Sequence, residues 1–494
     1  MSALKTQDHN SGYENIAGKS VRGAFWVFGS FGFGKVLGFI QTIILVRMLE
    51  PTDFGLMAIA GFATALMNVF TQTGINVALI HRQENVDRAA DAAWVISLLR
   101  GLVLFIAIFL CAGLAARFFE NPEVRPILRL VSISFLVGGT GSMGSVLIRK
   151  EMNFKRRAVF FQMADVLSIA TTVGLAFILR SVWALAWGRL ATSVFTVTAS
   201  YLMHPWRPRL RVDWRLAAEL FKYGKHVLAA GVIIFFLTQG DDAFVGKMLG
   251  ASALGFYTLA YGLSNLPATC ISHVISQVTF PAYSKIQNDR KRLSEAYRTV
   301  LSLVSLAAFP IAAGIAFLGN DIVRVVYGPK WLPMVPSMQV LCLFGLFRCF
   351  GGTMGQIFYA VGRPQVLSKL AAAQLVILCA VIYPLTSALG ILGTSIATTV
   401  AEVPVIVWGG TKVASILQLD VRKVIQPLAY PVLGTVFMAV SLAAMKILLP
   451  GAWTTAVLIG AILGAAMLYA GVILLIRGTA VSEISRLALS LKRG

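Results

Sequence analysis

The sequence is poor in charged residues. Of its 494 residues only 13% are Asp, Glu, Lys or Arg, roughly half the share found in soluble globular proteins. In contrast, 57% are hydrophobic, and the mean hydropathy is +0.78. A water-soluble fold is therefore excluded. Long apolar runs recur along the whole chain, as they do in helical membrane proteins that cross the bilayer many times.

Residues that build metal and catalytic centres are also scarce. The 5 histidines are scattered, and the 5 cysteines lie inside apolar runs without the spacing of metal ligands. The sequence contains no phosphate-binding loop, and the glycine-rich stretch 29–38 lies in an apolar run with no preceding strand. We therefore expect no metal, no cofactor and no ATP hydrolysis.

The apolar runs predict an all-α integral membrane protein with about fourteen transmembrane helices. The spans are expected at residues 21–46, 54–80, 92–116, 127–148, 158–179, 182–203, 224–246, 254–280, 299–318, 335–360, 366–389, 391–411, 426–445 and 453–476. The longest external loop is expected at 319–334, with Trp331 at the membrane interface.

Basic residues outnumber acidic ones by 43 to 21, which gives a net charge of +22. An excess of this size is found in nucleic-acid-binding proteins, but here most Lys and Arg fall in alternate loops. With both termini cytoplasmic, these loops lie on the cytoplasmic side, as the positive-inside rule requires. We expect the loops to rest on anionic lipid headgroups, and we expect no nucleic-acid partner.

An internal repeat divides the chain. Residues 47–60 align without gaps on residues 247–260, with Met, Leu, Gly and Ala recurring identically, and residues 191–194 align on 397–400. Repeats of this kind are typical of transporters. They predict an N-terminal lobe of helices 1–6 at residues 1–212, a C-terminal lobe of helices 7–12 at 213–418, and two additional transmembrane helices at 419–494.

Charged residues inside the predicted spans are the candidate functional residues. Each costs roughly 3 kcal/mol at the centre of a membrane helix, so it is expected to face protein or water. Several cationic groups in one cavity suit an anionic ligand, particularly a phosphate or pyrophosphate. The predicted substrate-binding bases are Lys35, Arg100, Arg189 and Arg348.

Lys35 is the first choice among these bases. It lies in mid-span among glycines, and Lys35, Gly38 and Thr42 share one face of the predicted helix, with Gln41 beside them. Gln41 and Thr42 are therefore predicted to line the cavity. Two roles remain open for Lys35, in a water-filled cavity or in a buried pair with an acidic residue.

Acidic residues within the spans are predicted to bind a coupling ion or to pair with the bases. In the seventh span, Thr238, Asp241 and Asp242 share a face, and Gln239 lies beside them. This span is the repeat partner of the first. One of its acids is expected to carry protons or bind a cation, unless both lie at the external end in solvent. The acidic candidates are Asp165, Asp241, Asp242 and Glu402.

Five segments carry a family resemblance, at residues 46–56, 241–250, 254–261, 280–283 and 322–331. They resemble the bacterial polysaccharide transporter family, the Wzx-type flippases of the multidrug/oligosaccharidyl-lipid/polysaccharide exporter superfamily. The resemblance runs from about residue 20 to 410. It implies two six-helix lobes around a V-shaped central cleft with a cationic interior.

The resemblance also implies a function. Such a protein moves undecaprenyl-diphosphate-linked oligosaccharide from the cytoplasmic to the periplasmic leaflet of the bacterial inner membrane by alternating access. The product feeds exopolysaccharide, capsule or O-antigen assembly, so a polysaccharide polymerase and chain-length machinery are expected partners.

Other functions remain as alternatives. A lipid II flippase or a multidrug exporter of the same superfamily would have a similar helical architecture, although a cavity for cationic drugs would favour acidic residues. An integral membrane polysaccharide polymerase or ligase would need a substantial external loop with catalytic residues, and the predicted external loops are short. A transporter, not an enzyme, is therefore predicted.

Overall fold

A computed structural model describes residues 26, 29–71, 79, 86–151, 153–210, 214–448 and 453–476, which form helices and connecting turns without a strand. The chain divides into two compact units, Met1–Gly255 and Phe256–Gly494. This division follows packing, whereas the predicted lobes follow the sequence repeat, so the boundaries at 212 and 418 stay predictions. Most of residues 21–28 in the first predicted span and of residues 72–80 in the second lie outside the described residues.

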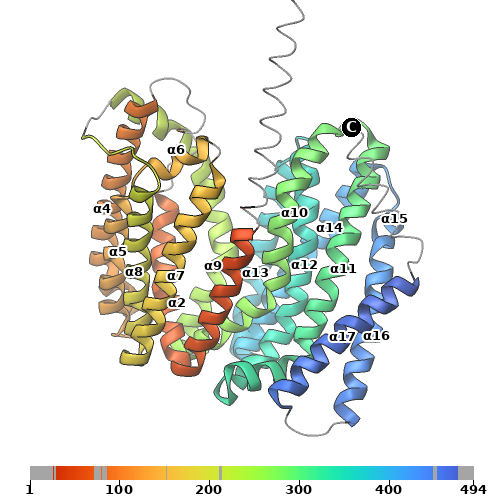
Figure 1. The fold of residues 1–494 in the computed structure, drawn as a ribbon. Helices are drawn as coiled ribbons and strands as arrows, with labels where there is room; N and C mark the ends of the chain where they lie inside the picture. The colour runs from red at the N-terminus through yellow and green to blue at the C-terminus, as the bar shows by residue number, and fades with distance from the viewer. Residues whose placement is uncertain are drawn as a thin grey trace, which may run out of the picture. The chain divides into compact units, whose positions relative to one another are not determined.

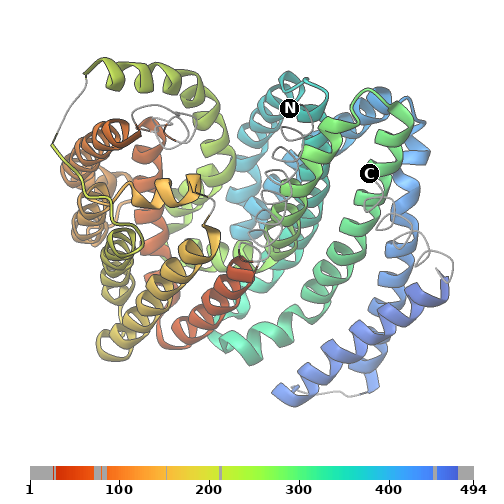
Figure 2. The same ribbon diagram turned by 45° about the horizontal axis from the view of Figure 1, so that its top comes forward.

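The N-terminal unit is a bundle in which α5 contacts α2, α4 and α8, and α7 packs along α8. Figures 1 and 2 show α4, α5 and α8 side by side in both views. The helices of this unit are Gly29–Met48, α2 (Pro51–Phe70), α4 (Val86–Phe118), α5 (Val124–Gly139), α6 (Gly144–Lys150), α7 (Phe154–Leu179), α8 (Val182–Leu202) and most of α9 (Trp214–Ser264).

The C-terminal unit is arranged around α12, which contacts α10, α11 and α14, while α16 and α17 pack on α11. Its helices are α10 (Leu266–Lys285), α11 (Arg290–Ile322), α12 (Val335–Ala360), α13 (Gln365–Leu389), α14 (Ile391–Leu417), α15 (Val421–Ile425), α16 (Ala429–Leu448) and α17 (Thr455–Ile476).

Eleven helices in the described part of the chain are long and apolar enough to cross a membrane, or up to twelve if the bent pair α5–α6 is one span. The 21-residue α8 and the 20-residue α10 are of similar length but are not among them. The integral membrane fold is thus confirmed, while the count of fourteen stays a prediction. Large apolar side chains such as Leu110, Ile178 and Leu475 point outward, where lipid would cover them.

Two predicted features of the spans are wrong. The predicted loop 319–334 is almost entirely helical, because α11 continues into a π-helical turn (Val323–Tyr327) and a 3₁₀ helix (Pro329–Met334). Trp331 is fully buried within the protein, with its ring edge-on to Phe256 at 5.7 Å between centroids, and its place at the membrane interface stays a prediction. The predicted span 254–280 is interrupted at Asn265, between α9 and α10.

The two copies of the repeat break their helices at equivalent positions. Glu50 has extended backbone before α2, and Gly250 has φ +83° inside α9, where two helices meet at a kink. A positive φ of this size is readily adopted only by glycine. Asp53 closes the first copy: its carboxylate accepts from the amides of Glu50 and of Val182, both at 2.8 Å. One side chain therefore caps the N-terminal ends of both α2 and α8.

Within the N-terminal unit the two copies also contact each other reciprocally. A Cβ added at Gly55 would lie 1.7 Å from the carbonyl oxygen of Ala251, and one added at Gly255 would lie 1.9 Å from that of Pro51. Residues 51 and 55 are the repeat equivalents of 251 and 255. The backbones therefore cross at a distance that only glycine permits at these two positions.

This crossing predicts the effect of single methyl groups on stability. Gly55→Ala should lower the free energy of unfolding by about 1–3 kcal/mol, because the backbone of the other copy must move to accommodate the methyl group. Gly255→Ala should act in the same direction. Thermal unfolding of the purified chain in lipid nanodiscs measures both effects.

Gly61→Ala on the same helix is the matched control, since a Cβ there would have no atom within 4 Å. It should leave stability unchanged or raise it slightly, because alanine favours helix more than glycine does. Equal stability of the Gly55→Ala and Gly61→Ala variants would contradict the close crossing.

Candidate functional site

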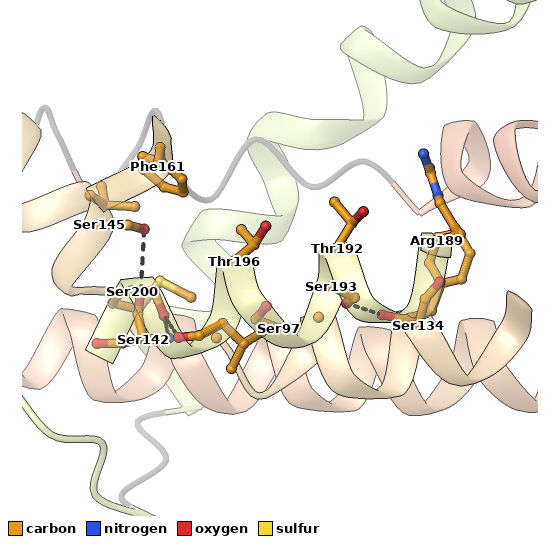
Figure 3. Close-up of a pocket in the computed structure, with 16 residues that line it drawn as sticks. Ser97, Ser134, Ser142, Ser145, Phe161, Arg189, Thr192, Ser193, Thr196 and Ser200 are labelled. Carbon is orange, nitrogen blue, oxygen red and sulfur yellow. Dashed lines mark hydrogen bonds between the residues drawn. The ribbon is translucent and has the colours of Figure 1, made fainter. Parts of the chain in front are cut away.

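A cavity of about 470 Å³ with many hydroxyl side chains in its wall lies inside the N-terminal unit, between α4, α5, α6, α7 and α8. This volume is within the range of small-molecule binding pockets. The aromatic side chains of Phe135 and Phe161 cover part of the wall, and Arg189 lies at one end (Figure 3). Eight hydroxyl side chains line it: Ser97, Ser134, Ser142, Ser145, Thr192, Ser193, Thr196 and Ser200.

The cavity forms where a span is broken. The helices α5 and α6 meet at an angle of 53° across residues 140–143, next to a run of glycines. Hydroxyl groups satisfy the backbone amides exposed by the break: Ser200 Oγ accepts from the amide of Ser142 at 2.9 Å, and Ser142 Oγ accepts from that of Gly144 at 3.1 Å. Broken helices at membrane depth persist only where protein or water replaces the missing hydrogen bonds.

Glycines bring α4 and α5 together beside the cavity. A Cβ at Gly101 would lie 2.6 Å from the carbonyl oxygen of Phe135, and one at Gly139 would lie 2.9 Å from that of Ser97. Ser97 and Phe135 both line the cavity. The position of the wall is therefore fixed by direct backbone packing of two helices.

Arg189 is the one predicted base that lines this cavity, and its side chain is exposed. Arg157, near the start of α7, lies over the ring of Phe161 with 5.1 Å between the guanidinium carbon and the ring centroid. Phe161 is itself a cavity residue. Two positive charges therefore flank a cavity otherwise lined by hydroxyl and apolar groups.

Lys35 is exposed on the helix Gly29–Met48, with its ammonium nitrogen 5.5 Å from the centroid of the Phe31 ring. Gln41 and Thr42 are half-buried, and the Thr42 hydroxyl donates to the carbonyl of Gly38 at 2.9 Å. A cavity role for these three residues stays a prediction.

Arg100 is held by other helices of its own unit. Its Nε donates to the hydroxyl of Thr71 at 3.1 Å, and its Nη2 donates to the side-chain oxygen of Asn68. The guanidinium thereby ties α4 to the C-terminal end of α2. This pairing gives Arg100 a structural role, whether or not it also contacts substrate.

Arg348 lies in a comparable network in the C-terminal unit. Its Nη1 donates to the hydroxyl of Tyr261 at 2.7 Å and to Asn265 Oδ1 at 3.4 Å, and the guanidinium lies over the Phe344 ring at 5.6 Å. Asn265 is buried at the break between α9 and α10. A second broken span thus also has an arginine beside it.

The acidic candidates lie in different surroundings. Glu402 is buried and accepts a hydrogen bond from the amide of Gln374 on α13. Asp165 is exposed on α7. Asp241 is only 3% exposed and Asp242 is half-buried. The two carboxylates are therefore not simply exposed to solvent at a helix end. An ion-coupling role for any of the four stays a prediction.

The polar partners predicted beside the acids of α9 are half-buried. The Thr238 hydroxyl donates to the carbonyl of Ile234 at 2.8 Å, which uses its proton within the helix. Gln239, the second of these polar residues, is also half-buried. Among the described side chains, no group of three or more His, Cys, Asp or Glu residues comes together to hold a metal ion.

The sequence prediction therefore found one residue of the cavity, Arg189, and missed its hydroxyl lining. A signal was present in the predicted fourth span, where Gly138, Gly139, Gly141 and Gly144 follow one another within seven residues. Glycine runs of this kind inside an apolar segment indicate a broken helix and a binding site.

Comparison with known proteins places the chain in a family. Residues 44–336 match the family of polysaccharide biosynthesis proteins. The chain belongs to this family. The lipopolysaccharide biosynthesis protein WzxC of Escherichia coli is 28% identical over 71% of this chain and 72% of its own length. The succinoglycan biosynthesis transport protein ExoT of Rhizobium meliloti is 22% identical over 64% of this chain and 63% of its own length.

A solved structure shares the fold. The lipid II flippase MurJ in an inward closed conformation superposes with a TM-score of 0.70, covering 92% of this chain and 99% of its own, at 14% identity. The predictions of a polysaccharide transporter family and of an all-helical transporter fold are confirmed. The protein is a multi-pass membrane protein with the helical fold of this structure.

The Arg348 network predicts a stability effect. Tyr261→Phe removes the acceptor of a charge-assisted hydrogen bond and should lower the free energy of unfolding by about 1.5–3 kcal/mol. Thermal unfolding in nanodiscs measures it. Tyr383→Phe is the control, because the Tyr383 side chain is exposed on α13. Equal melting temperatures for the two variants would show that Tyr261 contributes no stability through Arg348.

Proposed function

We propose that this protein moves undecaprenyl-diphosphate-linked oligosaccharide from the cytoplasmic to the periplasmic leaflet of the bacterial inner membrane, for exopolysaccharide, capsule or O-antigen assembly. The supporting observation is a cavity lined by hydroxyl groups, with an arginine at its edge, inside an apolar helical bundle of the polysaccharide biosynthesis family. Both termini are proposed to be cytoplasmic, in line with the distribution of Lys and Arg.

The substrate explains why such a cavity is needed. Sugar hydroxyls and a diphosphate cannot enter hydrocarbon without losing water that nothing replaces. In this proposal a polar, cationic cavity replaces that water, while the polyprenyl tail stays in lipid. Alternating access of the cavity then exposes the headgroup on the other side.

Among the predicted bases, Lys35 and Arg189 are the best candidates to meet the diphosphate. Their side chains are exposed, whereas Arg100 and Arg348 already donate hydrogen bonds to neighbouring helices. Binding alone gives transport no direction. Asp165, Asp241, Asp242 and Glu402 are therefore proposed as candidates for ion coupling, and a polysaccharide polymerase with its chain-length machinery as the consumer of the product.

A lipid II flippase is the second candidate, since MurJ shares the fold. It is not favoured, because the sequence relatives are named for lipopolysaccharide and succinoglycan biosynthesis. A multidrug exporter fits less well with exposed bases. A membrane polymerase or ligase would leave the transporter relatives unexplained.

Depletion of the protein in its source cells tests the proposal. Lipid-linked oligosaccharide should accumulate in the cytoplasmic leaflet, as measured with a membrane-impermeant sugar probe on oriented vesicles. Lys35→Gln should slow translocation about tenfold or more, since it removes a charge-assisted contact to the diphosphate. Lys412→Gln on α14 is the control, an exposed lysine outside the proposed site.

Two outcomes would contradict the proposal. If intact repeat units still reached the periplasmic leaflet in depleted cells, the protein would act after translocation. If Lys35→Gln and Lys412→Gln both transported at the normal rate, Lys35 would not be a substrate contact and the diphosphate site would lie elsewhere.

A further inference from the structure

Most hydroxyl groups of the cavity donate their hydrogen bond to a backbone carbonyl of the protein itself. Ser134 Oγ donates to the carbonyl of Val131 at 2.6 Å, Thr192 Oγ1 to Gly188 at 2.9 Å, and Ser193 Oγ to Ser134 at 2.7 Å. Ser200 Oγ donates to the carbonyl of Val197 at 2.6 Å. A hydroxyl oxygen keeps two lone pairs after donating. These groups therefore offer a ligand acceptors, not donors.

Two backbone donors at the break are also occupied. The amides of Ser142 and Gly144, which a phosphate would need, are bonded to the hydroxyls of Ser200 and Ser142. An anion in the cavity would thus meet a wall of acceptor oxygens. The remaining side-chain donors are Arg189 at one end, the hydroxyls of Ser97 and Thr196, to which the structure assigns no partner in the described part of the chain, and the hydroxyl of Ser142, which accepts from Gly144 but donates to no described group.

A wall rich in acceptors with a few hydroxyl donors matches a neutral sugar ring. Sugar hydroxyls donate and accept, and the two apolar ring faces need apolar cover, which Phe135, Val146 and Val197 provide. The volume of about 470 Å³ suits one or two small rings, not a whole oligosaccharide. Arg189 lies at one end of the cavity (Figure 3), so a charged substituent of such a ring would find its cationic partner there.

We infer that the cavity at the broken span binds a neutral sugar ring of the lipid-linked substrate through hydroxyl acceptors, with Arg189 contacting the adjoining phosphate or another anionic substituent. This inference rests on the proposed function and deepens it. The sugar and the charged group are then bound by different parts of the protein. The hydroxyl acceptors of the cavity bind the sugar, and the exposed basic side chains bind the anionic group.

The test uses the full chain in lipid nanodiscs, because sugar-based detergents would compete for the cavity. Two probes come from the source cells: the intact lipid-linked oligosaccharide, and undecaprenyl diphosphate without sugar. Affinities are measured by competition against radiolabelled intact lipid. The wild-type chain should bind the intact lipid more tightly than undecaprenyl diphosphate.

Thr196→Val is the main variant, because the Thr196 hydroxyl makes no hydrogen bond in the described structure whose loss would disturb folding. It should weaken binding of the intact lipid about fivefold to tenfold, as expected for one hydrogen bond, and leave binding of undecaprenyl diphosphate unchanged. Thr192→Val should act in the same way. Arg189→Gln should weaken the binding of both probes where Arg189 contacts the phosphate, and of the intact lipid alone where it contacts an anionic substituent of the sugar.

Thr198→Val is the matched control. Thr198 lies on the same helix, and its hydroxyl donates to the carbonyl of Val194 at 2.9 Å, like Thr192 to Gly188, but its side chain is exposed and outside the cavity. Thr198→Val should bind both probes as the wild type does.

Three results would overturn the inference. Equal binding by Thr196→Val, Thr192→Val and Thr198→Val would show that the cavity does not contact the sugar. Equal weakening of both probes by Thr196→Val would place the diphosphate in the cavity. If the wild-type chain bound neither probe, the proposed function would fail and this inference with it.

Discussion

Lipid hydrocarbon offers no hydrogen-bond partners, so every backbone amide and carbonyl inside a membrane must be satisfied by the protein. This constraint accounts for the all-helical fold of the described residues. It also governs the side chains: Thr42, Thr64, Ser168 and Thr172 donate to the carbonyl four residues earlier in their helices. The chemistry of the cavity follows, because hydroxyls used in this way keep only their acceptor lone pairs for a ligand.

Lipid also removes the hydrophobic driving force for packing between helices, and close packing of small residues replaces it. Gly101 and Gly139 bring α4 and α5 together beside the cavity, and Gly188 packs on Thr172 between α8 and α7. Charged residues then act as cross-links. Arg100 joins α4 to α2, and in the other unit Lys446 lies 2.8 Å from the Asp321 carboxylate, which joins α16 to α11.

The family, the membrane class and the repeat could be predicted from the sequence, because the length of apolar runs and aligned motifs are local signals. Contacts between segments far apart in the sequence could not be predicted. The partners of Arg348 come from residues more than 80 positions away, and the cavity wall needs Ser200 to reach the break at Ser142. The loop predicted at 319–334 is wrong for a local reason: the segment contains Pro329 and Pro333, and proline is compatible with the first turn of a helix.

The reciprocal contact of Gly55 and Gly255 limits how far the two copies of the repeat can diverge. Each glycine touches backbone of the other copy, not a side chain. No substitution at residue 51 or 251 can make room for a methyl group, because every amino acid carries the same carbonyl oxygen. After duplication, most positions of the two halves were free to vary independently. At this crossing, a mutation in one half has no compensating mutation at the contacted residue of the other.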